Sequence, residues 1–462
     1  MRRRKDTVAL GRDRGRLPVS ASWLLWLPDL AIAALLSALT YVAYRWVAGP
    51  SVLHQSSELH FVLLAEALLH GRLWLDPTQA ARLGDITVFA GRYYVAFPPM
   101  PAILMLPFVA WRGPSFDDRL FSIALGSVNV GLTYLLARRL TWPRFSDLAV
   151  PIGRIEAVAV AVLLGFGTVA FYSALAGTVW FVAHIVALCF TLLYLLECTG
   201  ACRPLVAGVL LAAAFLARAP AIFGLVFWAI LALRCTRGFR EALWLASRFA
   251  IPLVVAVVLL LAQNFVRFNS PFDFGYRSMR IASQLRPDLE QYGQFSSHFL
   301  PRNLAALLIT APLVSPTDLA TWVGSADGPS VLLYRLTTLP EPGVPPFPVT
   351  FDPWGTGLWA VSPALAFGLR PPGRRYALAF AAGLAALVVA IPDLLYYNTG
   401  WYQYGYRFAA DFIPFLLILV VLGLRRPLPP ALRALFVLLL LISIASNLLG
   451  VRWFLHLPPY ED

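Results

Sequence analysis

The sequence predicts an all-α membrane protein, a polytopic bundle of transmembrane helices, and three observations carry this prediction. The chain has 462 residues, of which 59% are hydrophobic and only 13% are charged. Apolar runs of about twenty residues, the length that a helix needs to cross a bilayer, recur from one end of the chain to the other. Backbone groups in lipid must form hydrogen bonds within their own segment, so such runs fit helices and not barrel strands.

The third observation is that arginines gather at the ends of the apolar runs and explain the net charge of +13. The clusters comprise Arg2, Arg3, Arg4, Arg12, Arg14, Arg16, Arg138, Arg139, Arg234, Arg237, Arg240, Arg370, Arg374, Arg375, Arg425 and Arg426. Cytoplasmic loops of membrane proteins carry an excess of basic residues, so we place these ends in the cytoplasm. The charge therefore predicts contact with membrane lipids and no nucleic-acid partner.

The apolar runs set the order of segments along the chain. Residues 1–22 form a basic cytoplasmic arm, and residues 23–462 form a single transmembrane domain. The predicted spans are residues 23–47, 119–136, 156–174, 178–197, 203–217, 220–234, 249–266, 356–370, 376–392, 412–424 and 432–449, about eleven crossings that leave the C-terminus outside. Two exterior regions, residues 49–118 and 267–354, separate them.

Both exterior regions are expected to contain short interfacial helices. Residues 99–111 are apolar but too short to cross a bilayer comfortably, so they are predicted to form an interfacial or re-entrant segment. The region 267–354 is long for an unstructured loop, and residues 304–314 within it are apolar enough to dip into the membrane.

Sequence motifs of soluble enzymes are absent. The chain has no Walker A, His-Glu-x-x-His or Gly-x-Ser-x-Gly pattern, and its four cysteines match no zinc spacing. The glycines at 165 and 167 formally fit a dinucleotide motif, but they lie inside an apolar run and favour helix packing. We expect no cofactor and no protein metal site, and a divalent metal ion stays an open alternative.

The first exterior region contains the best candidate for a catalytic base. Ser56 or Ser57 is expected to cap a helix reaching His70, with Glu58 in its first turn. A helix dipole favours the ionised carboxylate there, so Glu58 is the hypothesised general base. The alternative is that Glu58 only bonds the free amides of the helix.

Several other residues of this region support or replace Glu58 in that hypothesis. His60 and Glu66 are polar residues of the same predicted helix and are assigned supporting roles. Asp85 and Asp118 are the less favoured alternative bases.

Arginines in exterior segments run against the charge rule and suggest an anionic ligand. Arg92 and Tyr93 precede a Pro-Pro step, Arg218 marks a broken helix pair, and Arg407 follows an aromatic run. Arginine binds phosphate through two parallel hydrogen bonds, so these residues are candidate phosphate ligands. Tyr404 and Asp411, on either side of Arg407, are assigned supporting roles.

The order of features in residues 50–140 resembles the GT-C glycosyltransferases, in particular protein O-mannosyltransferases and lipid A aminoarabinose transferases. The resemblance rests on Ser57-Glu58, Phe61, Ala65-Glu66-Ala67-Leu68-Leu69-His70-Gly71, Gly91-Arg92-Tyr93-Tyr94-Val95-Ala96-Phe97-Pro98-Pro99 and Arg119-Leu120. The family typically shows an Asp-Glu pair after the first span, an A-E-x-L-L-x-G helix, a G-x-x-Y-x-x-x-P-P step and an R-L opening to the second span. Two positions depart from it, because Ser57 replaces the first acid and Ala96 stands near the usual lysine.

The resemblance implies an activity and its partners. It implies a sugar donor linked to polyprenyl phosphate, transfer to an acceptor hydroxyl on the outer face, and inversion at the sugar by one carboxylate base. The acceptor, whether lipid, glycan or protein, is not indicated. The implied location is the plasma membrane of a bacterium, with the N-terminus in the cytoplasm.

Two alternative functions belong to other classes. A transporter or lipid flippase would place ionisable groups at mid-membrane on repeated broken helices, whereas most predicted spans here lack central charges. A non-catalytic lipid-binding homologue is the second alternative, and Ser57 in place of the family acid favours it.

Overall fold

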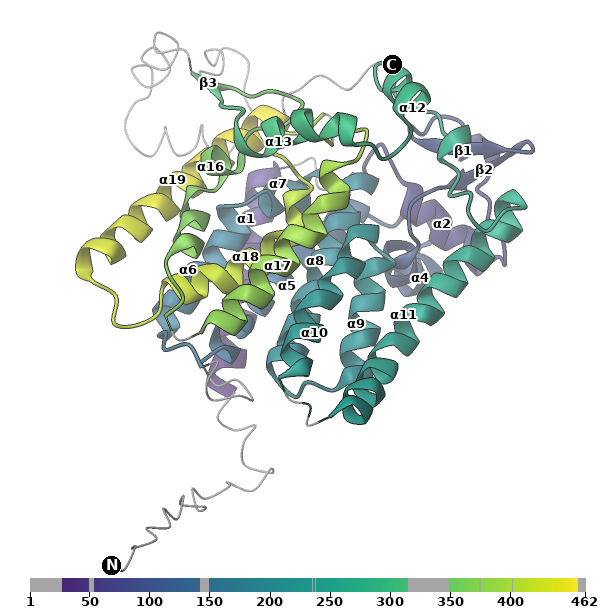
Figure 1. Ribbon diagram of the computed structural model, residues 1–462. Helices are drawn as coiled ribbons and strands as arrows, with labels where there is room; N and C mark the ends of the chain where they lie inside the picture. The colour runs from purple at the N-terminus through teal and green to yellow at the C-terminus, as the bar shows by residue number, and fades with distance from the viewer. Residues whose placement is uncertain are drawn as a thin grey trace, which may run out of the picture.

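The computed structural model describes residues 27–49, 54–141, 149–234, 236, 238–314, 349–373, 375–400 and 402–455. The predicted arm and most of the second exterior region, residues 315–348, lie outside this part of the chain. The fold is a bundle of helices with shorter elements gathered at one end (Figure 1), which confirms the predicted class.

Six helices in the described residues are long and apolar enough to cross a membrane. They are α1 (Leu27–Ala48), α5 (Asp118–Arg139), α8 (Val179–Thr199), α11 (Phe239–Phe268), α17 (Tyr376–Leu394) and α19 (Pro430–Leu455). The pair α6 (Arg154–Phe166) and α7 (Ala170–Ala176) is bent by 48° and makes a seventh if it counts as one span. The protein is therefore built as an integral membrane protein.

The other predicted spans fall on shorter or broken helices. They correspond to α9 (Pro204–Phe215), η5 (Ala219–Gly224) with α10 (Leu225–Leu233), α16 (Leu358–Val361) with η8 (Pro363–Leu369), and α18 (Ala409–Gly423). Proline lies in the first turn of both η5 and η8, where a helix can begin but not continue. The number of crossings, about eleven by sequence, stays a prediction.

Short elements gather at one end of the bundle, which we call the hairpin end. They are α2 (His60–Leu69), α3 (Pro77–Ala80), β1 (Ile86–Phe89), β2 (Arg92–Val95), α4 (Met100–Arg112), η3 (Gly113–Ser115), η6 (Tyr276–Ser278), α12 (Arg286–Tyr292), η7 (Ser297–Phe299), α13 (Leu300–Leu308), β3 (Leu313–Val314) and β4 (Val349–Thr350). Helix α4 is the short apolar piece expected at residues 99–111.

The β1–β2 hairpin was not predicted. Its strands are antiparallel, with Ile86 opposite Val95 and Phe89 opposite Arg92. Ala90 and Gly91 join them with φ of 48° and 73°, as a tight two-residue hairpin turn requires. The strands are too short for their alternation to be recognised in sequence.

The start of α2 corrects a prediction. The helix begins at His60 without a side-chain cap, so Glu58 precedes it and does not lie in its first turn. The Ser56 hydroxyl, the expected cap, instead donates to Asp118 Oδ2 at 2.5 Å, while the Ser56 amide donates to Asp118 Oδ1 at 2.9 Å. Buried Asp118 thus binds the serine that was expected to cap α2. This contact anchors the segment that precedes α2 to α5.

Arginines gather at the opposite end, which we call the arginine end. Asp29 of α1 pairs with Arg138 and Arg154, at 3.2 and 3.0 Å. Glu156 pairs with Arg426 at 2.8 Å. Further hydrogen bonds of arginines at this end include those of Arg203 with Glu197, Arg370 with Gly423 and Arg375 with Ala149. In the described part of the chain, arginines from several of the clusters read from sequence thus lie at one end of the bundle.

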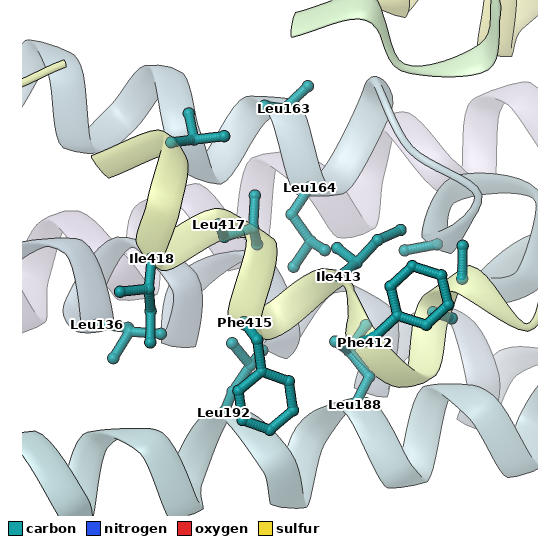
Figure 2. Packing of buried hydrophobic residues seen from close by; sticks show 14 of the residues in the cluster. Leu136, Leu163, Leu164, Leu188, Leu192, Phe412, Ile413, Phe415, Leu417 and Ile418 are labelled. Carbon is teal, nitrogen blue, oxygen red and sulfur yellow. The ribbon is translucent and has the colours of Figure 1, made fainter. Parts of the chain in front are cut away.

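Helix α18 occupies the centre of the bundle. Figure 2 shows side chains of α18 among Leu136 of α5, Leu163 and Leu164 of α6, and Leu188 and Leu192 of α8; those labelled are Phe412, Ile413, Phe415, Leu417 and Ile418. Nearly every residue of α18 is buried, as expected of a helix that is apolar on all sides. Any polar group on α18 must therefore find its partners inside the protein.

Close approach of α9 and α11 depends on Gly208. A Cβ at this position would lie 2.2 Å from the Phe249 carbonyl oxygen, whereas a Cβ on Gly383 of α17 would meet nothing within 4 Å. We predict that Gly208→Ala lowers thermal stability in detergent by the equivalent of about 1–3 kcal/mol, because the helices must separate. Gly383→Ala is the matched control and should leave stability unchanged or raised. Equal melting temperatures for the two variants would contradict the packing.

Candidate active site

Arg218 lies at the break between α9 and η5 that the sequence predicted. Its backbone is extended, with φ −146° and ψ 118°, and Pro220 lies in the first turn of η5. The guanidinium donates to Asp411 (Nε–Oδ2 3.0 Å, Nη2–Oδ2 2.7 Å) and to Asp393 (Nη2–Oδ1 3.3 Å). The other oxygen of Asp411 lies 2.9 Å from His184 Nδ1. Arg218, Asp393, Asp411 and His184, here called the Asp411 cluster, therefore join five elements: α8, α9, η5, α17 and α18.

Arg407 lies beside this cluster but has different partners. Its guanidinium carbon is 5.4 Å from the centre of the Phe408 ring, and that of Arg218 is 5.0 Å from the same ring. Its Nη1 donates to the Gly400 carbonyl at 2.7 Å, and its side chain also lies over Phe181. Arg407 is 5% exposed, and among the described residues its Nε has no hydrogen-bond partner. Two guanidinium groups thus share one ring, and only Arg218 of the two is seen paired with carboxylates.

The charge of Arg407 persists at neutral pH. Burial, with a contribution from the charge of Arg218, lowers the pKa of Arg407 to about 10, while Tyr172 and Asp85 act in the opposite direction. A buried guanidinium with an unused donor is unfavourable unless an anion or water meets it. Arg407 is therefore the better candidate of the two for binding an anionic ligand.

Asp85 faces the same region from the hairpin. Its backbone has φ 46°, a conformation that few residues other than glycine adopt. The Trp180 indole donates to Asp85 Oδ2 at 2.8 Å. Burial raises the pKa of Tyr276, and the charges of Arg218 and Asp85 respectively lower and raise it. The charge of Asp85 also acts on Tyr396 and Arg407, so we call Asp85, Trp180, Tyr276, Tyr396 and Arg407 the Asp85 site.

Glu58 supports the backbone next to Asp85. Its Oε2 accepts the Gly84 amide at 3.1 Å, and the Gly84 carbonyl lies 2.8 Å from His60 Nε2. His60 Nδ1 is 3.6 Å from Glu58 Oε2. Burial lowers the pKa of His60 to about 4, so the ring is neutral at pH 7. The predicted base and its histidine neighbour therefore contact one peptide segment.

The structure brings some predicted residues to the site and leaves others elsewhere. Arg218, Arg407 and Asp411 meet beside Phe408, and Asp85 interacts with Arg407 through its charge. Arg92 is exposed on β2 with its guanidinium 4.0 Å from the Trp74 ring centre. Tyr93 of the same strand lies under Arg280, 5.5 Å from its guanidinium carbon. We therefore withdraw Arg92 and Tyr93 as donor ligands in favour of Arg407.

Three further predicted residues lie outside the two groups of side chains described above. Asp118 is held by Ser56, which explains its burial without a catalytic role. Tyr404 is fully buried and donates to the Ser446 carbonyl at 2.8 Å, so it belongs to the core. Glu66 is half-buried on α2 and belongs to neither group, so we withdraw the supporting role expected for it.

Sequence reasoning missed five residues of the two groups. They are His184, Asp393, Trp180, Tyr276 and Tyr396. His184 and Asp393 carried a usable signal, because ionisable residues inside apolar segments are costly and mark functional sites. The aromatic residues carried none, since tyrosine and tryptophan are common at any membrane interface.

A protein-held metal site is not evident in the described part of the chain, where no group of three or more His, Cys, Asp or Glu side chains could hold an ion. The alternative of a divalent metal therefore stays open and enters none of the steps below.

Two solved structures have a similar arrangement of helices. One is the apo oligosaccharyltransferase of Archaeoglobus fulgidus, with 14% identity over 94% of this chain and 56% of that chain, and a TM-score of 0.48. The other is ArnT from Cupriavidus metallidurans bound to undecaprenyl phosphate, with 15% identity over 91% of this chain and 63% of that chain, and a TM-score of 0.47.

Both are membrane glycosyltransferases of the GT-C superfamily, the group that the sequence motifs resemble. This chain spans less than two thirds of either structure. No protein-family model matches the sequence, and no curated protein matches it.

Because His60 is buried, we predict that the stability of the protein depends on pH. Its folded-state pKa of about 4 lies below the ordinary value of 6.5, so between these values the unfolded chain binds a proton that the folded chain does not. The stability that comes from burying the neutral His60 ring is fully present above pH 6.5. It is lost as the pH falls from 6.5 toward 4. We predict a loss on the order of 2 kcal/mol between pH 7 and pH 5.

The test is the slope of melting temperature against pH for two histidine variants. His60→Gln should flatten the slope, because the titrating group is gone. His70→Gln removes an exposed histidine at the opposite end of the same helix and should keep the wild-type slope. A wild-type slope in His60→Gln would contradict the assignment.

Proposed function

We propose that the protein is a membrane glycosyltransferase that uses a sugar donor linked to polyprenyl phosphate. The observation that carries the proposal is the Asp85 site. There the Asp85 carboxylate accepts a hydrogen bond from Trp180, and it interacts through its charge with the buried Arg407 guanidinium, which lies over Phe181 and Phe408 and has no carboxylate partner among the described residues. The motif order in residues 50–140 supports the same class. The arginine end is the cytoplasmic side by the charge rule, so the site faces the outer side.

Arg407 is the proposed ligand of the donor phosphate. Guanidinium binds phosphate through charge-assisted hydrogen bonds, and in the described part of the chain Arg407 has an unused donor where Arg218 has two carboxylates. The lipid tail of such a donor stays in the bilayer, so its phosphate reaches the protein at the depth of the helix ends. Arg218 then acts through the Asp411 cluster, which holds Phe408 and the helix ends in place.

Asp85 is the proposed general base, in place of Glu58. The carboxylate takes the proton of an acceptor hydroxyl as its oxygen attacks the anomeric carbon. The bond from that carbon to the phosphate oxygen breaks, and the electron pair leaves with the polyprenyl phosphate. Attack opposite to the leaving group inverts the sugar, and Arg407 stabilises the charge that develops on the phosphate.

The alternative of a transporter receives less support. Such proteins place ionisable groups at mid-membrane. In the described residues the buried ion pairs of the helices lie toward the arginine end, as with Asp29, or toward the hairpin end, as with Asp411.

Substitution of Asp85 tests the base. Asp85→Asn should lower kcat for sugar transfer by about a hundredfold or more, because a positioned base is lost. The measurement is transfer of radiolabelled sugar from polyprenyl-phosphate donors to lipid acceptors by purified protein in liposomes. Asp76 is an exposed aspartate of the same hairpin end, so Asp76→Asn is the control and should keep activity. Full activity in Asp85→Asn would move the base elsewhere.

Substitution of Arg407 tests the phosphate contact. Arg407→Gln should weaken binding of a short-chain polyprenyl phosphate by about ten- to a hundredfold, the value of a charge-assisted hydrogen bond. Arg407→Lys should recover part of the affinity. Arg92→Gln, which removes an exposed arginine, should bind as the wild type does. The reverse order, with Arg92 essential and Arg407 dispensable, would restore the assignment made from sequence.

A further inference from the structure

Two side chains hold the single peptide segment that presents Asp85. The Gly84 amide donates to Glu58 Oε2 at 3.1 Å, and the Gly84 carbonyl lies 2.8 Å from His60 Nε2. A carbonyl oxygen only accepts, so His60 Nε2 carries the proton in this pair. Both polar groups of Gly84 are thus satisfied by residues that lie about twenty-five positions earlier in the chain.

We propose that Glu58 and His60 are positioning residues that hold Gly84 so that Asp85 keeps its left-handed backbone and points its carboxylate into the site. This inference rests on the proposed function, because it assigns Asp85 as the base. Glu58 does not act as the base itself.

The backbone of Asp85 requires such support. A φ of 46° is strained for a residue with a Cβ, and strained residues persist only where their surroundings hold them. The Gly84 carbonyl belongs to the same peptide plane as the Asp85 amide, so the His60 contact fixes that plane directly. The Glu58 contact fixes the preceding plane. With both planes held and Trp180 bonded to the carboxylate, the Asp85 side chain has little freedom.

The surroundings of the two side chains fit a supporting role. His60 is fully buried and packs edge-on against Phe97, with ring centres 5.9 Å apart. Both carboxylate oxygens of Glu58 lie near Gly84, since a Cβ added to this glycine would be 3.5 and 3.9 Å from them. A base must instead direct an oxygen at the acceptor hydroxyl.

Two conservative variants of Glu58 separate positioning from base catalysis. Glu58→Gln keeps the length of the side chain and an oxygen that accepts from Gly84. Glu58→Asp keeps the charge, but its side chain is one methylene shorter and cannot reach the Gly84 amide. Positioning predicts that Glu58→Gln stays within about threefold of wild-type kcat while Glu58→Asp loses about tenfold or more, with donor KM little changed. Base catalysis by Glu58 predicts the opposite order.

The pH profile gives a second readout. If Asp85 is the base, the acidic limb of kcat/KM persists in Glu58→Gln and disappears in Asp85→Asn. Glu66 is a half-buried glutamate on α2, the helix that follows Glu58, so Glu66→Gln is the matched control and should leave both kcat and the profile unchanged. Loss of the acidic limb in Glu58→Gln would overturn the proposal.

Hydrogen exchange tests the positioning without an activity assay. In the peptide that contains Gly84 and Asp85, Glu58→Asp should speed amide exchange by about tenfold, and Glu58→Gln and Glu66→Gln should not. Unchanged exchange in Glu58→Asp would overturn the positioning role whatever the activity. Faster exchange in a protein that transfers no sugar would leave the positioning role standing and refute the proposed function instead.

Discussion

The arrangement of the hairpin end depends on the ion pair between Arg218 and Asp411. Asp411 lies on α18, a helix of which nearly every residue is buried, and a lone carboxylate would be strongly unfavourable there. Arg218 supplies two donors to one of its oxygens, and His184 lies at the other. Removing one member would leave a buried charge without compensation. The cluster therefore fixes the ends of several helices relative to one another.

Because of this ion pair, the two arginines that lie over the Phe408 ring have different roles. The charge of Arg218 is matched by Asp411 and Asp393, and its role is to hold the helix ends. Arg407 has a backbone carbonyl and two aromatic rings as partners, so its charge remains available. Side chains of one type, a few ångströms apart, thus acquire different roles from their neighbours. The difference cannot be read from the residue type.

The opposite side of the site shows the same division between a supporting and a presented carboxylate. Glu58 accepts the Gly84 amide, while Asp85, one residue further on, carries its side chain toward Trp180 and the arginines. The strained backbone at Asp85 is tolerated because the peptide planes on both sides of the preceding residue, Gly84, have side-chain partners. A helical bundle thereby fixes one irregular turn through side chains from outside that turn.

The sequence by itself determined the class of protein, most of the helical segments, the gathering of arginines at one end and the importance of the region that contains Glu58 and Asp85. These features are local, since apolar length and charge at the ends of a run follow from adjacent residues. It also placed Arg218 at a helix break, because Pro220 follows. It misplaced the start of α2 and did not foresee the β1–β2 hairpin.

Only the tertiary structure decided which charges meet. Arg218 and Asp411 are 193 residues apart, and Trp180 and Asp85 are 95 apart. Ser56 hydrogen-bonds Asp118, which lies 62 residues later in the chain, and so it does not cap α2. The role of a carboxylate or a guanidinium depends on its partners and its burial, and both come from packing between distant segments. That is the physical reason why the sequence indicates the region of the site, while the structure separates the residues that support it from those proposed to act.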